Sequence, residues 1–229
     1  MNHATKALPA LLALACAGCI SVLPEPKDAA PRYDVALPEV PATAAAPAPD
    51  AAPAPARILV VGKVRAAEEA SGRAIRTADL ETGRTGRLSD GELALTPEAI
   101  VGAFLRARLS AAHPGAIVCD ASVAPHAGDR TTFGAWIERF RLEKREDGWF
   151  FTVRLRVLAE APDGSVAVTD AAQSVPVAAE GSRPTAAETA RAISKAIDAC
   201  AAMATRAAGE EVNEDDGCHG ADSENRGHP

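Results

Sequence analysis

Two stretches that alternate between apolar and polar residues place the strongest constraint on the fold of this chain. Residues 134–142 and 149–159 each show the two-residue period of a strand with one buried face. The dipeptide Asp147-Gly148 between them is favoured in two-residue hairpin turns. A turn centred on it fixes a register with apolar partners on one face: Leu142 with Val153, Phe140 with Leu155, and Trp136 with Ala159. The sequence therefore predicts a long antiparallel hairpin inside a sheet.

The same register gathers four arginines on the opposite face of the hairpin. It pairs Arg141 with Arg154 and Arg139 with Arg156, and like charges directly opposite each other are destabilising. Glu143 relieves only part of this repulsion. Two interpretations remain open: a solvated face whose long side chains extend into water, or a site for anionic groups such as lipid headgroups or acidic residues of a partner.

Further strands flank the hairpin in the sequence. Short apolar runs predict strands at residues 57–64, 116–119 and 165–177. Pro176 marks the last of these as an edge strand or a strand end, because proline cannot donate a ladder hydrogen bond. Residues 66–91 are polar and rich in glycine, which predicts a loop with one short strand near residues 73–77.

Two helices have clear start signals. Thr96 is a good N-cap and precedes a proline at the first helical position, in a helix that ends near residue 113. Thr185 and Glu188 form a capping box before an Ala-rich helix that extends to about residue 208. The element order β, α, β, three-stranded meander, α predicts an α/β fold: a two-layer domain whose mixed, mostly antiparallel sheet is packed by two main helices.

The N-terminal residues have the pattern of a signal peptide, expected over residues 1–18. Residues 7–15 are apolar but too few to span a bilayer, which takes about 20 residues. Ala17-Gly18 before Cys19 resembles the lipobox of bacterial lipoproteins. This resemblance implies that Cys19 is diacylglycerated and becomes the mature N-terminus, and Ile20 in place of Asp implies an outer-membrane protein that faces the periplasm. The alternative is an ordinary secretory signal that leaves a soluble periplasmic protein.

The lipidated cysteine is followed by a tether, a domain and a tail. Residues 19–56 are rich in Pro and Ala and form a tether that reaches on the order of 100 Å if it is wholly polyproline-like. The alternative is plain disorder without a set length. Its tyrosine, Tyr33, marks either a short docked segment or nothing in particular. Residues 57–208 form the domain. Gly209 is expected to end the last helix, and residues 209–229 form an acidic, disordered tail.

The sequence shows no catalytic or metal-binding constellation. Five histidines are scattered at positions without recognisable motif spacing: His3, His113, His126, His219 and His228. We therefore expect no enzymatic activity, metal or cofactor, and the formal charge of −7 argues against nucleic-acid binding. Cys119 and Cys200 are expected either to form a disulfide in the oxidising periplasm or to stay as free thiols.

The predicted strand and helix order, behind CISVLPEP and the Pro/Ala segment, resembles the ABC-type transport auxiliary lipoproteins, which include the paraquat-inducible C-type lipoproteins. The chain departs from the family between Arg65 and Leu95, where Leu93-Ala94 replaces an aromatic residue before the first helix. The resemblance implies a non-catalytic component of mammalian-cell-entry lipid transport. Its partners would be a mammalian-cell-entry protein and ABC transporter subunits, with self-association through a sheet edge as a further expectation. The alternative is a lipoprotein activator or scaffold of cell-wall synthesis.

Overall fold

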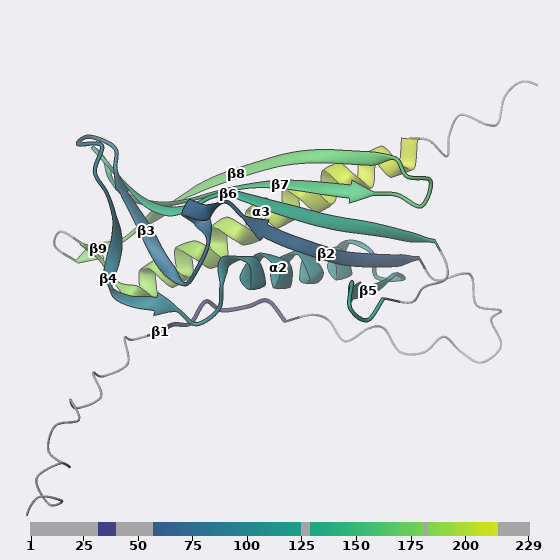
Figure 1. Ribbon diagram of the computed structural model, residues 1–229, viewed down its shortest axis with the longest axis horizontal. Coiled ribbons are helices and arrows are strands. Elements are labelled where there is room, and N and C mark those ends of the chain that lie inside the picture. The colour runs from purple at the N-terminus through teal and green to yellow at the C-terminus, as the bar shows by residue number, and fades with distance from the viewer. Residues whose placement is uncertain (1–31, 40–56, 125–128, 181–182, 215–229) are drawn as a thin grey trace, which may run out of the picture. The chain divides into compact units, whose positions relative to one another are not determined.

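The computed structural model describes residues 32–39, 57–124, 129–180 and 183–214. The predicted signal peptide, Cys19 and the tail beyond residue 214 lie outside these residues. Within them the fold is the predicted two-layer α/β arrangement, with a curled mixed sheet on one side and two helices on the other (Figure 1).

The sheet is built around its longest strand. β6 (Arg130–Arg145) pairs along one side with β7 (Gly148–Glu160), which in turn pairs with β8 (Val166–Val177), and all three are antiparallel. On its other side β6 pairs in parallel with two shorter strands placed end to end. β2 (Ile58–Ala66) lies along its first half and β3 (Ala74–Asp79) along its second half. The sheet therefore forks on one side of β6.

Each arm of the fork carries further strands. Beyond β2 lies β5 (Ile117–Asp120), and beyond β3 lies β4 (Thr85–Leu93), which pairs with β1 (Arg32–Tyr33). A 3₁₀ turn, η1 (Glu68–Ala70), joins β2 to β3. A separate small ribbon is made by β9 (Ala179–Glu180) and β10 (Arg183–Pro184).

The two helices begin where the sequence predicts. In α2 (Pro97–Ala112) the Thr96 hydroxyl accepts a hydrogen bond from the Ala99 N–H. In α3 (Ala186–Glu214) the Thr185 hydroxyl accepts from the Glu188 N–H at 3.3 Å. The end of α3 differs from the prediction, because the helix continues through Gly209 to residue 214 instead of stopping there.

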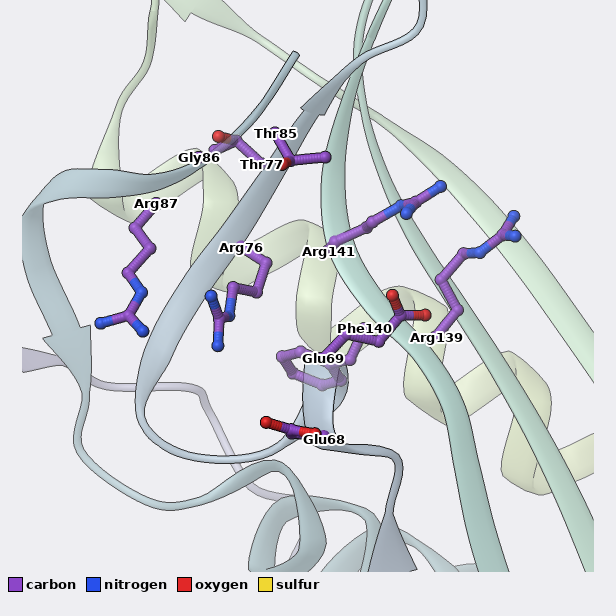
Figure 2. Close-up of a pocket in the computed structure, with 10 residues that line it drawn as sticks. All are labelled: Glu68, Glu69, Arg76, Thr77, Thr85, Gly86, Arg87, Arg139, Phe140 and Arg141. Carbon is purple, nitrogen blue, oxygen red and sulfur yellow. The ribbon is translucent and has the colours of Figure 1, made fainter. Parts of the chain in front are cut away.

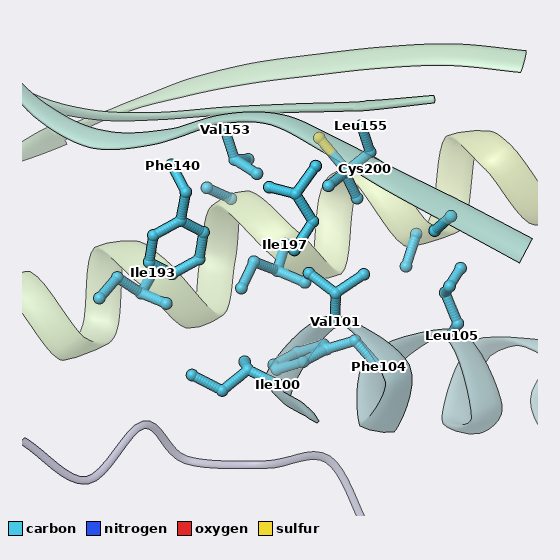
Figure 3. Close-up of a cluster of buried hydrophobic side chains, with 14 of the residues drawn as sticks. Ile100, Val101, Phe104, Leu105, Phe140, Val153, Leu155, Ile193, Ile197 and Cys200 are labelled. Atoms are coloured by element: carbon cyan, nitrogen blue, oxygen red, sulfur yellow. The ribbon is translucent and has the colours of Figure 1, made fainter. Parts of the chain in front are cut away.

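The core lies between the helices and the inner face of the sheet (Figure 3). Phe140 packs edge-to-face against Phe151 with ring centroids 4.8 Å apart, which adds to the stabilisation from buried apolar area. Three groups of buried side chains meet here: Phe140, Val153 and Leu155 from the hairpin, Ile100, Val101 and Phe104 from α2, and Ile193, Ile197 and Cys200 from α3. Small buried residues such as Ala196 and Ala204 let α3 approach closely.

The hairpin exists, but its predicted register is wrong. Arg145 pairs with Gly148, so the turn is centred on Glu146-Asp147, and Gly148 begins β7 with a φ of +129° that suits glycine. The partners near the turn are therefore Leu142 with Phe151 and Phe140 with Val153.

A β-bulge shifts the register again further along the hairpin. Ile137 pairs with Leu155 and Arg139 with Arg154, which leaves Glu138 as the extra residue. An extra residue reverses the in–out alternation beyond it. Ile137 is therefore fully buried, whereas Trp136, predicted on the core face, is 39% exposed on the outer one.

Part of the predicted tether belongs to the domain. β1 adds in parallel to β4, and the Ala94 N–H donates to the Tyr33 carbonyl at 3.0 Å. The Tyr33 side chain is only 4% exposed and joins the main core. Further along the segment, the Ser194 hydroxyl donates to the Ala36 carbonyl at 3.0 Å. Residues 32–39 therefore lie against α2 and α3 (Figure 1). The predicted boundary at residue 57 is therefore too late.

Residues 66–91 contain more structure than predicted. The short strand expected near residues 73–77 is β3, but the predicted loop also contains β4. The turn between the two strands is closed by Asp79, whose carboxylate accepts from the backbone N–H groups of Glu81 and Thr82. Gly83 lies in this turn with a φ of +68°, a conformation that suits glycine.

Candidate functional site

The four predicted arginines share the outer face of the sheet, away from the helices. Arg139 and Arg141 extend from β6, and Arg154 and Arg156 extend from β7. Their cross-strand partners differ from the prediction. Arg139 lies opposite Arg154, Arg141 lies opposite Thr152, and Arg156 lies opposite Trp136. One like-charged pair therefore stands directly opposed instead of two.

The two arginines of β7 are compensated by carboxylates that the sequence did not single out. The bulge residue Glu138 lies 3.0 Å from Arg154 and 3.4 Å from Arg156. Asp170 on β8 lies 2.9 Å from Arg156, whose hydrogen bond lowers the pKa of the Asp170 carboxyl. This part of the face is a network of exposed ion pairs, which bind solvent as readily as a ligand.

Glu143 is the buried centre of the outer face. Its side chain is 3% exposed and accepts hydrogen bonds from Arg141 at 3.0 Å, Arg145 at 2.7 Å and Thr152 at 2.9 Å. Arg139 lies 3.7 Å away. Burial opposes the ionisation of Glu143, but these hydrogen bonds outweigh it, so its pKa lies below the ordinary value. Glu143 therefore pairs with three arginines and offsets more of their mutual repulsion than the sequence suggested.

A hollow of about 610 Å³ opens where the sheet forks, between β6 and the arm formed by β3 and β4 (Figure 2). Its charged lining comes from three strands, β3, β4 and β6, and from the 3₁₀ turn η1. The arginines are Arg76, Arg87, Arg139 and Arg141, and the carboxylates are Glu68 and Glu69. The volume lies within the range of small-molecule sites.

Three of these arginines form a row across the sheet. Arg76 on β3 pairs in register with Arg87 on β4 and with Arg141 on β6. Directly paired residues share a face, with Cβ atoms roughly 4.5–5.5 Å apart. Arg141 is held by Glu143. For Arg76 and Arg87, by contrast, no side-chain hydrogen bond or ion pair is found among the described residues. In addition, the Nε of Arg76 is shielded from solvent and has no partner there.

Sequence reasoning missed the two residues for different reasons. Arg87 lies in the segment predicted as a loop, whereas Arg76 lies in the short strand predicted near residues 73–77, for which no partner strand was predicted. The apolar Ile75 beside Arg76 was the local signal that places Arg76 on the face away from the core.

Of the two alternatives left open for Cys119 and Cys200, the structure shows the second: both thiols are free. Cys119 lies beside Val60, whose neighbours Leu59 and Val61 point into the main core. Cys119 and Val60 instead belong to a small apolar cluster on the other face of the sheet. Cys200 lies in the main core, where burial raises the pKa of its thiol to about 12. The sheet therefore separates the two sulfurs.

Exposed apolar side chains gather at one end of the outer face. Leu158 on β7 pairs directly with Val168 on β8, and Trp136 and Val166 lie nearby in the register. Within the described ranges β8 pairs only with β7, so its outer edge carries open backbone donors and acceptors. The prediction of an edge strand at Pro176 is therefore confirmed.

Neither a metal-binding cluster nor a membrane-spanning helix is found in the described part of the chain. No group of three or more His, Cys, Asp or Glu side chains there is arranged to hold a metal ion. No helix there is long and apolar enough to cross a membrane.

Comparison with known proteins identifies relatives of the fold but not a family. No family model and no curated protein matches the sequence. Protein XCC0632 from Xanthomonas campestris, described as DUF330, matches with a TM-score of 0.57 and 14% identity, over 80% of this chain and 99% of that one. An uncharacterized protein matches with a TM-score of 0.51 and 17% identity, over 69% and 92%. PelC from Paraburkholderia phytofirmans, described as a dodecamer, matches with a TM-score of only 0.39 and 16% identity, over 68% of this chain and 94% of that one. These matches establish a shared fold and nothing further.

Proposed function

We propose that the protein is a non-catalytic lipoprotein, anchored in the outer membrane through Cys19 and facing the periplasm. In this proposal it is an auxiliary component of an ABC-type, mammalian-cell-entry lipid transport system. The type of transport system is taken from the resemblance of the sequence to the ABC-type transport auxiliary lipoproteins. The docking of residues 32–39 onto the domain is the observation that supports this role over cell-wall synthesis.

Because residues 32–39 dock onto the domain, the free chain between Cys19 and the domain is shorter than predicted. Only residues 20–31 separate Cys19 from β1, and a chain of that length spans at most about 45 Å. A free tether as far as residue 56 would reach on the order of 100 Å. A wall-synthesis activator needs a long tether to work far from its membrane. A short one supports a role close to the bilayer, where lipids are handed over.

The outer face and the free edge of β8 offer surfaces for partners. The apolar strip of Trp136, Leu158, Val166 and Val168 suits a protein contact, because exposed apolar groups gain from burial. The β8 edge can accept a strand from a second copy or from a transport subunit. In this proposal the partners are the mammalian-cell-entry protein and transporter subunits, and copies of the chain associate through β8.

The proposal is tested by affinity purification from envelope membranes after mild cross-linking. A mammalian-cell-entry protein or its transporter should be recovered with the original chain and lost with Cys19→Ala, which removes the anchor. A variant with Trp136→Ser and Val168→Ser keeps the anchor but removes apolar contact area, and it should recover less partner. Recovery of wall synthases alone, with an intact lipid barrier in a deletion strain, would overturn the proposal.

A further inference from the structure

The row Arg87–Arg76–Arg141 places like charges in register on three neighbouring strands of the sheet. Like-charged side chains directly opposite each other on a sheet destabilise it. Arg76 is only partly exposed, and its Nε has no partner among the described residues. A buried donor without a partner is a further cost. The sheet therefore maintains an unfavourable arrangement at a place where it also opens into a hollow.

The arginine charge in the hollow is distributed unevenly. Arg141 hydrogen-bonds to Glu143, and Figure 2 shows the Arg139 and Arg141 side chains extending away from Arg76. Arg76 and Arg87 extend together on the other side of the hollow, with no carboxylate within ion-pair distance in the described part of the chain. Two guanidinium groups on neighbouring strands thus share one small space.

From this geometry we infer that the hollow binds a phosphate group between Arg76 and Arg87. Guanidinium groups form paired, charge-assisted hydrogen bonds with phosphate oxygens. A bound phosphate would neutralise the charge of both guanidinium groups and so remove the repulsion between the two arginines. The phosphate can belong to a phospholipid headgroup or to a soluble phosphate compound. The inference deepens the proposed function by naming a ligand class, and it rests on that function only for a lipid as the source.

Glu68 and Glu69 line the hollow beside these arginines and are exposed. Neither makes an ion pair with an arginine within the described ranges, and they lower the attraction of the hollow for a simple anion. A phosphate that carries a nearby ammonium group, as phosphoethanolamine does, can contact both kinds of charge. The carboxylates therefore favour a zwitterionic headgroup over inorganic phosphate.

The test is a calorimetric titration of the full chain carrying Cys19→Ala, which removes only the acylation site. Three probes separate the possible sources of the phosphate: inorganic phosphate, phosphoethanolamine, and the soluble short-chain lipid dihexanoyl-phosphatidylethanolamine. Similar affinities for all three assign recognition to the phosphate alone. Tighter binding of the lipid assigns it to a phospholipid headgroup. Both results support the inference, whereas the absence of binding by every probe overturns it.

Matched variants separate this site from general attraction to a positive surface. Arg76→Gln and Arg87→Gln should each weaken binding about tenfold, equivalent to about 1.4 kcal/mol. Arg154→Gln removes the same charge from the same face, but Arg154 pairs with Glu138, so this variant should bind almost normally. Equal losses in Arg154→Gln and Arg76→Gln would overturn the inference.

Stability measurements distinguish a binding role from a structural one. Because Arg76→Gln removes repulsion, its melting temperature should stay the same or rise while its binding falls. Arg87 is exposed on β4, so Arg87→Gln keeps the test valid if the Arg76 variant folds poorly. Unchanged binding in a fully folded Arg87→Gln variant, together with lower stability, would assign the arginines to the fold. The purified chain is tested alone, so failure here leaves the partner-recovery test of the proposed function unaffected.

Discussion

Replacement of Tyr33 by alanine tests whether residues 32–39 are an integral part of the domain. The Tyr33 side chain is 4% exposed and contributes to the main core, and its backbone accepts a hydrogen bond from the Ala94 N–H. Truncation of a buried aromatic side chain to alanine typically costs 3–5 kcal/mol. Tyr33 lies in a two-residue strand at the edge of the sheet, where neighbours can relax, so we expect a loss of about 3 kcal/mol.

This loss is large enough to measure by urea denaturation. It is a substantial part of the 5–15 kcal/mol that stabilises a typical domain. For a chain of this size it lowers the melting temperature by roughly 6–12 °C. A chain that begins at residue 57 should show a similar or greater loss. The control is Leu37→Ala in the same segment, because Leu37 is 42% exposed and should cost under about 1 kcal/mol. An unchanged urea midpoint for Tyr33→Ala would refute the assignment of this segment to the domain.

Three further predictions concern the anchor, the buried carboxylate and the thiols. Mass spectrometry of the mature protein should find an acylated N-terminus at Cys19, and full recovery of Cys19→Ala in the membrane fraction would contradict this. Glu143→Gln should cost about 3 kcal/mol, because it removes the buried carboxylate that pairs with the half-buried Arg141 and Arg145. Since the folded-state pKa of Glu143 is lowered, its stabilisation is complete above the unfolded-state pKa and is lost as pH falls through the folded-state pKa. The variant should therefore lose less stability on acidification than the original chain, and an identical pH profile would argue against this. Alkylation of unreduced, denatured protein should label both Cys119 and Cys200, while in folded protein Cys200 should stay unlabelled because its pKa is raised to about 12.

Local signals predicted the helices and much of the sheet. The N-caps at Thr96 and Thr185 depend on residues three positions apart, so the sequence contains the whole interaction. The edge position of β8 could be predicted from Pro176, because a single missing N–H restricts where a strand can lie.

Features that depend on distant partners could not be predicted in this way. The turn is centred on Glu146-Asp147 instead of Asp147-Gly148, and the bulge at Glu138, which gains two arginine partners on β7, shifts the register once more. β4 has no apolar alternation and exists because β3 and β1 supply hydrogen bonds on both sides. Tyr33 is a lone aromatic in a Pro/Ala segment, and only the assembled core shows where it packs.

The candidate site also combines features that local signals predict with features that depend on distant partners. Strand alternation, a local signal, predicted that the four arginines lie on the outer face. The carboxylates that pair with these arginines lie at the bulge and on β8. Arg76 and Arg87, which have no ion-pair partner among the described residues, are brought together by the pairing of β3 with both β4 and β6. A charge cluster assembled from the central strand and one arm of a forked sheet leaves no spacing motif in the sequence.

The most direct test of the central claim, that this chain handles lipid at the envelope, is photo-cross-linking in cells labelled with radioactive phosphate. A photoreactive residue in place of Thr85, which lines the hollow, should capture labelled phospholipid. The same residue in place of Asp163, in the exposed turn between β7 and β8, serves as the control. The account predicts strong labelling at position 85, loss of that labelling with Arg76→Gln, and little labelling at position 163. Equal labelling at both positions, or none at position 85, would contradict it.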